Sequence, residues 1–169
     1  MRRSDRDAEF SDYVAARRRE LSRTAYLLCG DTHRAEDLVQ TALTKLYLAW
    51  PRLRRDGNVD AYARRVLVTT HIDDTRRPWR RERPGLDGVD PVGVPGFASE
   101  DGDLLAQALA DLPPGQRRVV VLRHYWGLSV EETAADLGCS TGTVKSQTSH
   151  ALRRLESALS SHFDRKGLA

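Results

Sequence analysis

The stretch LSVEETAADLGCSTGTVKSQTSHALRRL, residues 128–155, decides the fold because it predicts two helices joined by a tight turn. Ser129 lies three residues before Glu132, and such a pair forms a capping box that satisfies free backbone amides at a helix start. Gly138 ends this first helix, because glycine readily adopts the left-handed conformation found at helix ends. The first helix therefore spans about two turns.

The second helix of this stretch has an apolar face and a polar face. Ser140 or Thr141 can cap it. Its apolar or small residues recur at helical spacing, at Val144, Thr148, Ala151, Leu152 and Leu155. The opposite face offers donors and hydroxyls with no carboxylate, at Thr143, Lys145, Ser146, Gln147, Ser149, His150, Arg153 and Arg154.

Two helices around a glycine-containing turn are typical of a helix-turn-helix, whose second helix enters the DNA major groove. Lysine and glutamine side chains can bond to purine edges, while serine and threonine serve phosphates or bases. On capping and periodicity alone, a helical hairpin with a solvated polar face is the alternative. The absence of an acidic residue from the polar face favours an anionic partner.

The 169-residue chain is long enough for one or two small domains, and its charge is unevenly distributed. Residues 1–83 carry 19 basic and 13 acidic side chains, residues 84–102 carry 0 and 4, and residues 103–169 carry 8 and 7. The basic excess is almost all arginine, which favours bidentate contacts to phosphate or carboxylate. Nucleic acid or an acidic protein surface is therefore the expected partner.

The cysteines and the hydropathy of the chain indicate the compartment in which the protein works. Cys29 and Cys139 follow apolar stretches and form no CxxC pair, so both are expected to be reduced core residues. Residues 1–10 lack the apolar segment of a secretion signal, and no run approaches the ~18 apolar residues that span a bilayer. We therefore expect a cytoplasmic protein that does not insert into membranes.

Apolar periodicity predicts one helix or two over residues 9–29, another over about 33–49, and a further one from a cap at Asp60. Residues 1–8 are charged and expected to be frayed. Pro51 is expected to stop the second helix because proline lacks a backbone N–H, and residues 53–60 are expected to form a loop. The third helix should end in a run of arginines around Trp79, whose ring can stack on a base or anchor the helix end.

Residues 84–103 are rich in Gly, Pro and Asp and have no helical period, so they predict a flexible acidic linker. After it, residues 104–112 predict a short helix stopped by Pro113, and Pro114 opens another that leads into the helix-turn-helix. The predicted fold is all-α. It has two small helical domains, residues 8–83 and 104–163, and the second contains four short helices with the helix-turn-helix.

Three segments together resemble a known family. LPPGQRRVVVLRHYWGLSVEETAADLGCSTGTVKSQTSHALRRL, residues 112–155, resembles region 4 of the extracytoplasmic-function (ECF) group of bacterial RNA polymerase sigma factors, SigE-like actinobacterial type. HRAEDLVQTALTKLYLAW, residues 33–50, is similar to region 2.2 of that family, and AYARRVLVTTHIDDTRR, residues 61–77, to regions 2.3 and 2.4. A helix-turn-helix alone is common among regulators, but both parts in this order, with the linker between them, are specific.

The resemblance implies a division of labour between the domains. The first would dock on the clamp of the RNA polymerase β′ subunit through Asp37, Leu38, Gln40, Thr41 and Lys45. The loop over residues 56–60 and the third helix would read and melt the promoter −10 element, through Asn58, Arg65, Thr69, Arg76 and Arg77. The second domain would set the polar face of its last helix against the −35 element, with Arg117, Arg118, Arg153 and Arg154 toward the phosphates.

The resemblance also implies partners: core RNA polymerase at its β′ clamp and β flap, promoter DNA, and an anti-sigma protein as a candidate regulator. No cofactor or metal is expected. The acidic linker would thread through polymerase channels and mimic nucleic acid there. Thr69 stands where many members have an asparagine of longer hydrogen-bonding reach, while Gln147 and His150 stand where basic residues are common.

Other classes of function are less compatible with the sequence. It has no P-loop, HExxH or GxSxG motif, and its five histidines have no metal-ligand spacing, so we expect no enzyme. A stand-alone helix-turn-helix regulator would bind duplex DNA at a palindromic site without polymerase. A helical adaptor that binds only protein would tolerate charge reversal at Lys145 and Arg153.

Overall fold

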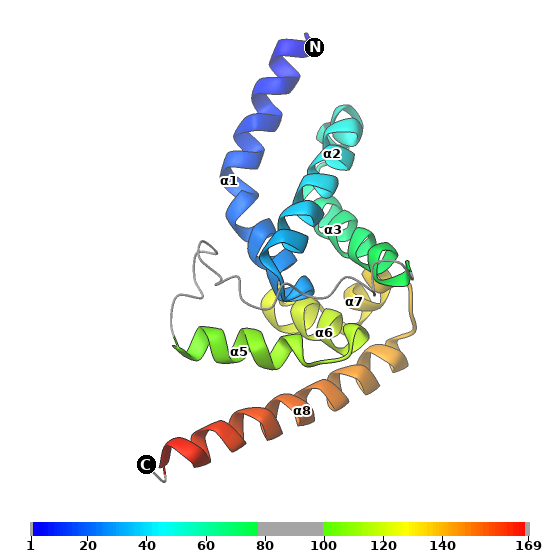
Figure 1. Ribbon diagram of the computed structural model, residues 1–169. Coiled ribbons are helices and arrows are strands. Elements are labelled where there is room, and N and C mark those ends of the chain that lie inside the picture. Colours follow the sequence, from blue (N-terminus) through cyan, green and yellow to red (C-terminus); the bar gives the residue numbers. More distant parts are fainter. Residues whose placement is uncertain (1, 78–99, 168–169) are drawn as a thin grey trace. The chain divides into compact units, whose positions relative to one another are not determined.

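The computed structural model describes residues 2–77 and 100–167, and every regular element within these two ranges is helical (Figure 1). The chain divides into two compact units, Met1–Tyr26 with Asp31–Val92, and Leu27–Gly30 with Gly93–Ala169. The predicted all-α class is confirmed. Trp79 and most of the predicted linker lie outside the described residues.

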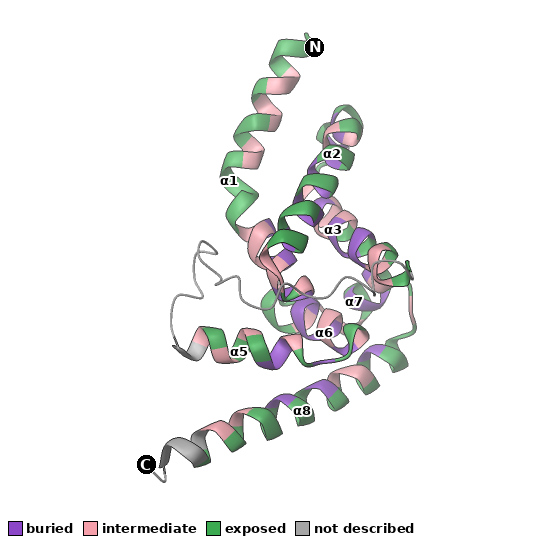
Figure 2. Cartoon of the chain, viewed as in Figure 1, coloured by how far each residue is buried: buried purple, intermediate pink, exposed green. Residues whose placement is uncertain are grey.

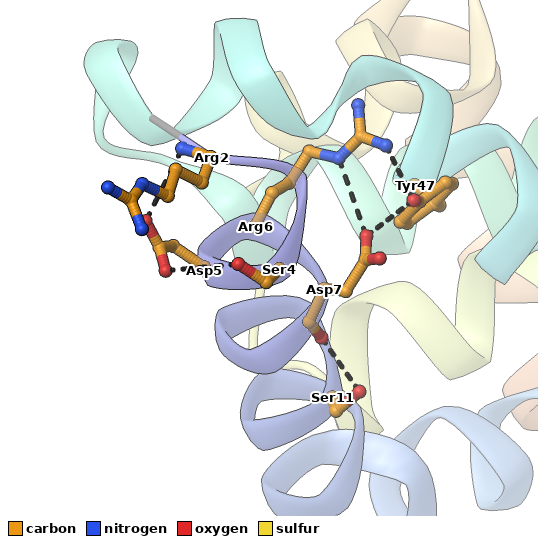
Figure 3. Close-up of polar contacts among 7 residues, drawn as sticks. All are labelled: Arg2, Ser4, Asp5, Arg6, Asp7, Ser11 and Tyr47. Atoms are coloured by element: carbon orange, nitrogen blue, oxygen red, sulfur yellow. Dashed lines mark hydrogen bonds and ion pairs between the residues drawn. The ribbon is translucent and has the colours of Figure 1, made fainter.

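Helix α1 (Arg3–Cys29) includes most of the segment 1–8 that was expected to be frayed, so that expectation is wrong. Side-chain contacts to α2 stabilise its first turns (Figure 3). The Arg6 guanidinium lies 4.6 Å from the centre of the Tyr47 ring and donates to Tyr47 Oη at 2.6 Å. Tyr47 Oη in turn donates to Asp7 Oδ1 at 2.6 Å. These partners are about 40 positions apart, beyond the reach of sequence periodicity.

Helix α2 (Thr32–Asp56) runs through Pro51, which was predicted to stop it. A proline removes one bond from the helix ladder, so something must offset that loss. Trp50 and Leu53, on either side of it, are only 4% and 7% exposed, and continuing the helix buries both. The helix ends at Gly57, whose φ of 80° is left-handed and whose N–H donates to the Leu53 carbonyl at 3.1 Å.

Four aromatic rings join α1 to α2 and form what we call the aromatic cluster: Phe10, Tyr13, Tyr47 and Trp50. The Phe10 ring lies edge-on to Tyr47 at 5.1 Å and to Trp50 at 5.2 Å, and Tyr13 lies 5.2 Å from Trp50. Edge-to-face rings at this spacing contribute beyond their buried area. The cluster therefore holds the amino-terminal half of α1 on α2.

Helix α3 (Val59–Arg76) is capped by Asn58, not by Asp60 as predicted. Asn58 Oδ1 accepts from the Ala61 N–H at 3.1 Å, so the capping side chain lies two residues earlier. Because α2 ends at Gly57, the expected loop over residues 53–60 is reduced to a turn. Leu67 and Val68 are fully buried in the core of this unit.

The second unit begins with α5 (Glu100–Ala110) and α6 (Pro114–Val120), followed by one π turn, η1 (Val121–Tyr125). Helix α5 starts at Glu100, so the predicted linker extends too far and its last residues are helical. Pro114 opens α6 as predicted. The π turn is the unpredicted feature, with the Trp126 N–H bonded to the Val121 carbonyl at 3.1 Å.

Helices α7 (Val130–Leu137) and α8 (Thr141–Gly167) form the predicted helix-turn-helix. The capping box is confirmed: the Glu132 N–H donates to Ser129 Oγ at 3.0 Å, and the Ser129 N–H donates to Glu132 Oε2 at 2.8 Å. Gly138 is left-handed, with a φ of 64°. Helix α8 is long, so the expectation of four short helices is wrong for the last one.

The buried positions of α8 recur along one side of the helix (Figure 2). Val144 and Ala151 are fully buried and Leu155 is 8% exposed, as the predicted apolar face requires. Leu152 was placed on that face but is 43% exposed, because it lies one position past the buried stripe. Val144 packs with Val119 and Ala134, which joins α8 to α6 and α7.

Candidate nucleic-acid interface

The exposed face of α8 carries the residues predicted to meet the −35 element. Ser140 caps the helix: its Oγ accepts from the Thr143 N–H at 3.1 Å and lies 2.9 Å from Thr143 Oγ1. The predicted set lies on this one helix, with Gln147 half-buried and the rest exposed: Thr143, Lys145, Ser146, Ser149, His150, Arg153 and Arg154. Burial of Val144 and Ala151 turns this face outward.

Hydrogen bonds within α8 already engage part of this face. Ser146 Oγ donates to the Thr143 carbonyl at 3.2 Å. The side chains of Lys145, Arg153 and Arg154 extend from exposed positions and carry its positive charge. An exposed helix face with cations and hydroxyls suits a partner with phosphates and base edges.

Arg117, predicted to face phosphates, caps α5 instead. Its Nη2 donates to the carbonyls of Ala110 and Leu112, the latter at 3.1 Å. The last carbonyls of a helix need such donors, because they have no partner within the helix. The guanidinium of Arg117 is therefore engaged by backbone carbonyls, which counts against the predicted phosphate contact.

The first unit has an open groove of about 430 Å³ between α2 and α3. Two cations, two apolar side chains and one aromatic ring line it: Lys45, Leu48, Ala49, Arg52 and Tyr62. Leu48 is 75% exposed and presents an apolar side chain to solvent between the two cations of the groove. Lys45 Nζ donates to Thr70 Oγ1 at 2.9 Å, so this cation is held against α3.

Sequence reasoning missed Leu48, Arg52 and Tyr62 as functional candidates. Stopping α2 at Pro51 left Arg52 outside the predicted helix, whereas in the continuous helix it lies seven residues after Lys45 and on the same face. Tyr62 lies three residues before Arg65 on α3. Helical spacing through Pro51 is the signal that would have revealed the groove.

The residues predicted to read the −10 element all lie on α3 or at its ends. Arg65 and Thr69 are exposed one turn apart, and Thr69 Oγ1 donates to the Arg65 carbonyl at 2.7 Å. Arg76 and Arg77 are exposed at the end of α3. Asn58, at its start, is exposed, but its amide oxygen is engaged in the cap.

The residues predicted to meet polymerase do not form one exposed set. Asp37, Gln40 and Thr41 are exposed on α2, with Gln40 Nε2 donating to Glu36 Oε1 at 3.1 Å. Leu38 is 2% exposed and belongs to the core, so its side chain cannot contact a partner directly. Lys45 is exposed one turn after Thr41 and also lines the groove.

Asp60, near the start of α3, accepts two bonds from α1. Tyr13 Oη donates to its Oδ1 at 2.9 Å, and Arg17 Nη2 donates to its Oδ2 at 2.7 Å. Burial, then the hydrogen bond to Asp60 and the charge of that carboxylate, raise the pKa of Tyr13 well above the ordinary tyrosine value. Tyr13 therefore remains a neutral donor.

The raised pKa of Tyr13 predicts alkaline destabilisation. Above about pH 10 the unfolded chain loses the phenol proton while the folded chain keeps it, so the free energy of unfolding falls as pH rises. The slope due to Tyr13 is at most about 1.4 kcal/mol per pH unit, and smaller because the ring is partly exposed. When the tyrosinate absorbance of the folded chain is followed as the pH is raised, part of the increase should therefore come late, well above the ordinary tyrosine pKa of about 10.

Tyr13→Phe should remove that late component. Tyr125→Phe, which deletes a tyrosine that is 38% exposed, should retain it because Tyr13 is intact. Complete ionisation of all tyrosines near the ordinary value of about 10 in the folded chain would contradict the prediction.

Within residues 2–77 and 100–167, no group of three His, Cys, Asp or Glu side chains is arranged to hold a metal ion. No helix in these ranges combines the length and apolar character needed to cross a bilayer.

Comparison with protein families matches both units. Residues 13–81 match Sigma-70 region 2, and residues 102–155 match Sigma-70, region 4. The RNA polymerase sigma-E factor of Streptomyces coelicolor is 42% identical over 158 residues, which cover 89% of this chain and 86% of that protein. The ECF RNA polymerase sigma factor SigM of Mycobacterium tuberculosis is 31% identical over 146 residues, or 86% of this chain and 74% of that protein.

Solved structures show the same likeness. The sigma factor RpoE of Bartonella quintana, solved in complex with the anti-sigma factor NepR, matches with a TM-score of 0.74 and 26% identity, over 90% of this chain and 97% of that one. The stand-alone regulator and the adaptor do not account for a region 2 match beside the helix-turn-helix. With both regions present in order and curated relatives matched over most of its length, the chain belongs to the ECF group of bacterial RNA polymerase sigma factors.

Proposed function

We propose that this sigma factor reads its promoters through two surfaces: the exposed face of α8 for the −35 element, and the α2–α3 groove with the adjoining face of α3 for the −10 element. The observation that carries the proposal is the groove, in which cations flank an exposed leucine and a tyrosine ring. Apolar and aromatic side chains can contact an unpaired base, and the cations beside them can bind its phosphate, so the groove suits a nucleotide whose base has left the duplex.

In this proposal the base enters the groove against Leu48 and Tyr62, and Arg52 holds the phosphate beside it. Lys45 supplies a second cation, steadied by its bond to Thr70. Arg65, Thr69, Arg76 and Arg77 then meet the strand along α3, and Asn58 offers its amide nitrogen at the start of the helix. Stacking would capture bases that melting has exposed, which favours the open form of the promoter.

On α8, Ser149 and His150 would face base edges with Lys145, Ser146 and Gln147, while Arg153 and Arg154 would meet phosphates. Thr143 would contribute at the amino-terminal end, where a recognition helix approaches the bases most closely. Phosphate contacts would make the interaction depend steeply on salt.

For polymerase docking we propose the exposed residues Asp37, Gln40 and Thr41 on the β′ clamp, with Leu38 supporting them from the core. The second unit would meet the β flap. An anti-sigma protein, the partner named for the RpoE of B. quintana, is a candidate inhibitor here too. The functional domains would be residues 8–83 and 104–163, and the protein would act in the cytoplasm by binding, without catalysis of its own.

Run-off transcription tests the proposal directly. Core RNA polymerase with this chain should start RNA synthesis at discrete new positions on fragmented genomic DNA, and core polymerase alone should not. Absence of new start sites, despite formation of the complex with core polymerase, would reject promoter recognition by this chain.

Groove variants test the −10 assignment. Tyr62→Leu combined with Arg52→Ala should lower open-complex formation by roughly tenfold or more, because base stacking alone contributes about 1–3 kcal/mol. Binding to core polymerase should not change. Permanganate reactivity of unpaired thymines on a promoter found by run-off transcription would measure the loss.

Arg55→Ala is the matched control, since Arg55 is an exposed arginine three residues along α2 that does not line the groove. It should open the promoter as the unmodified chain does. Equal opening by the control and the groove variant would count against the groove.

A further inference from the structure

Asp60 lies between two residues proposed to meet the −10 strand. Asn58 precedes it by two positions and Tyr62 follows it by two. The whole connection from α2 to α3 is the short turn at Gly57 and Asn58, and the Asn58 cap is a local bond to Ala61. Local bonds set the start of α3 but do not tie it to another helix.

Two bonds from α1 supply that tie, and we call Tyr13, Arg17 and Asp60 the α1–α3 network. Each carboxylate oxygen of Asp60 has its own donor, at 2.9 Å from Tyr13 Oη and 2.7 Å from Arg17 Nη2. Tyr13 and Arg17 are one helical turn apart, so both reach the same point. The Tyr13 ring also packs on buried Trp50, which connects the network to the aromatic cluster.

The network also neutralises a charge that opposes DNA binding. A carboxylate near the proposed path of the −10 strand repels phosphate, whereas pairing with Arg17 offsets that charge. Arg17 additionally lies 3.3 Å from Glu20, so its guanidinium is held in position by two carboxylates.

A second network of the same chemistry lies elsewhere on α1. Arg6 and Tyr47 meet the carboxylate of Asp7, so a tyrosine hydroxyl and an arginine again meet one aspartate (Figure 3). This network joins α1 to α2 and involves no residue of α3. A substitution in this second network therefore serves as a comparison, because it removes similar bonds at a place away from the start of α3.

We propose that Asp60 is a positioning residue for promoter opening: the α1–α3 network holds the start of α3 so that Asn58 and Tyr62 meet the −10 strand in a fixed geometry. The inference rests on the function proposed for the groove and the turn. A site held in its binding geometry before the strand arrives loses less entropy on binding.

The test uses holoenzyme made with the full chain and a promoter on which the unmodified holoenzyme starts transcription. Asp60→Asn should lower open-complex formation by about tenfold, because the contact residues are displaced. Substitution of single −10 bases should then change open-complex formation less than it does with the unmodified chain. Core polymerase binding should be unchanged. Asp7→Asn, the matched control, should open the promoter normally, and its thermal unfolding midpoint should be no higher than that of Asp60→Asn.

Two further variants separate positioning from general stability. Arg17→Lys preserves the ion pair and should retain opening, whereas Arg17→Met should resemble Asp60→Asn. Arg17→Met and Asp60→Asn should be non-additive in combination, because each removes the same ion pair.

Normal opening and an unchanged −10 base profile for Asp60→Asn, while the groove variant at Arg52 and Tyr62 is defective, would overturn this inference alone. If the groove variant is also normal, the proposed −10 site and this inference fail together.

Discussion

Lys145→Glu combined with Arg153→Glu is expected to abolish promoter-directed transcription, with a loss of at least about a hundredfold. Both side chains lie on the exposed face of α8, and loss of a base contact such as the one proposed for Lys145 costs about 1–3 kcal/mol. Reversal removes two attractions and adds two repulsions. Run-off transcription with saturating core polymerase would measure the loss, and DNA binding should show a shallower salt dependence.

The control for this variant is Ser157→Glu with Ser160→Glu, which adds two carboxylates farther along the same helix at exposed positions. It should keep its transcription and its affinity for core polymerase. Transcription that survives the reversal at Lys145 and Arg153 would show that the face of α8 is not the −35 reader.

Trp50→Ala is expected to cause the largest loss of stability, about 3–5 kcal/mol. The indole is 4% exposed and lies 5.2 Å from both the Phe10 and Tyr13 rings, so its removal leaves a cavity between α1 and α2. Small domains have total stabilities of about 5–15 kcal/mol, so the first unit would be partly unfolded at moderate temperature. Urea unfolding followed by circular dichroism would measure the shift.

Leu48→Ala is the matched control, two residues away on the same helix. Leu48 is 75% exposed, and truncation there should change the free energy of unfolding by less than about 0.5 kcal/mol. A loss below about 1 kcal/mol for Trp50→Ala would show that the aromatic cluster does not hold α1 on α2.

The helix-turn-helix could be predicted closely from sequence, because the interactions that form it are local. The capping box joins Ser129 and Glu132, three residues apart, and Gly138 closes α7 through its own conformation. The exposed face of α8 followed from the same periodicity. Leu152 is the exception. It lies at the border of the buried stripe, and packing against neighbouring helices decides whether a residue at that border is buried or exposed.

The first unit could be predicted less well, because its boundaries depend on distant partners. Pro51 was expected to stop α2 on local grounds, and burial of Trp50 and Leu53 outweighs that local cost. The groove was therefore missed, since Arg52 joins Lys45 on one face only if the helix continues.

By itself, the sequence determined the all-α class, the helix-turn-helix and the face of α8 that bears its cations, because caps and helical periodicity act within a few residues. Tertiary structure alone decided that α1 begins at Arg3, that Arg117 caps a helix and that Asp60 pairs with α1. Tyr13 and Asp60 are 47 positions apart, and no local pattern specifies which side chains meet at that separation. Packing of whole helices brings them together.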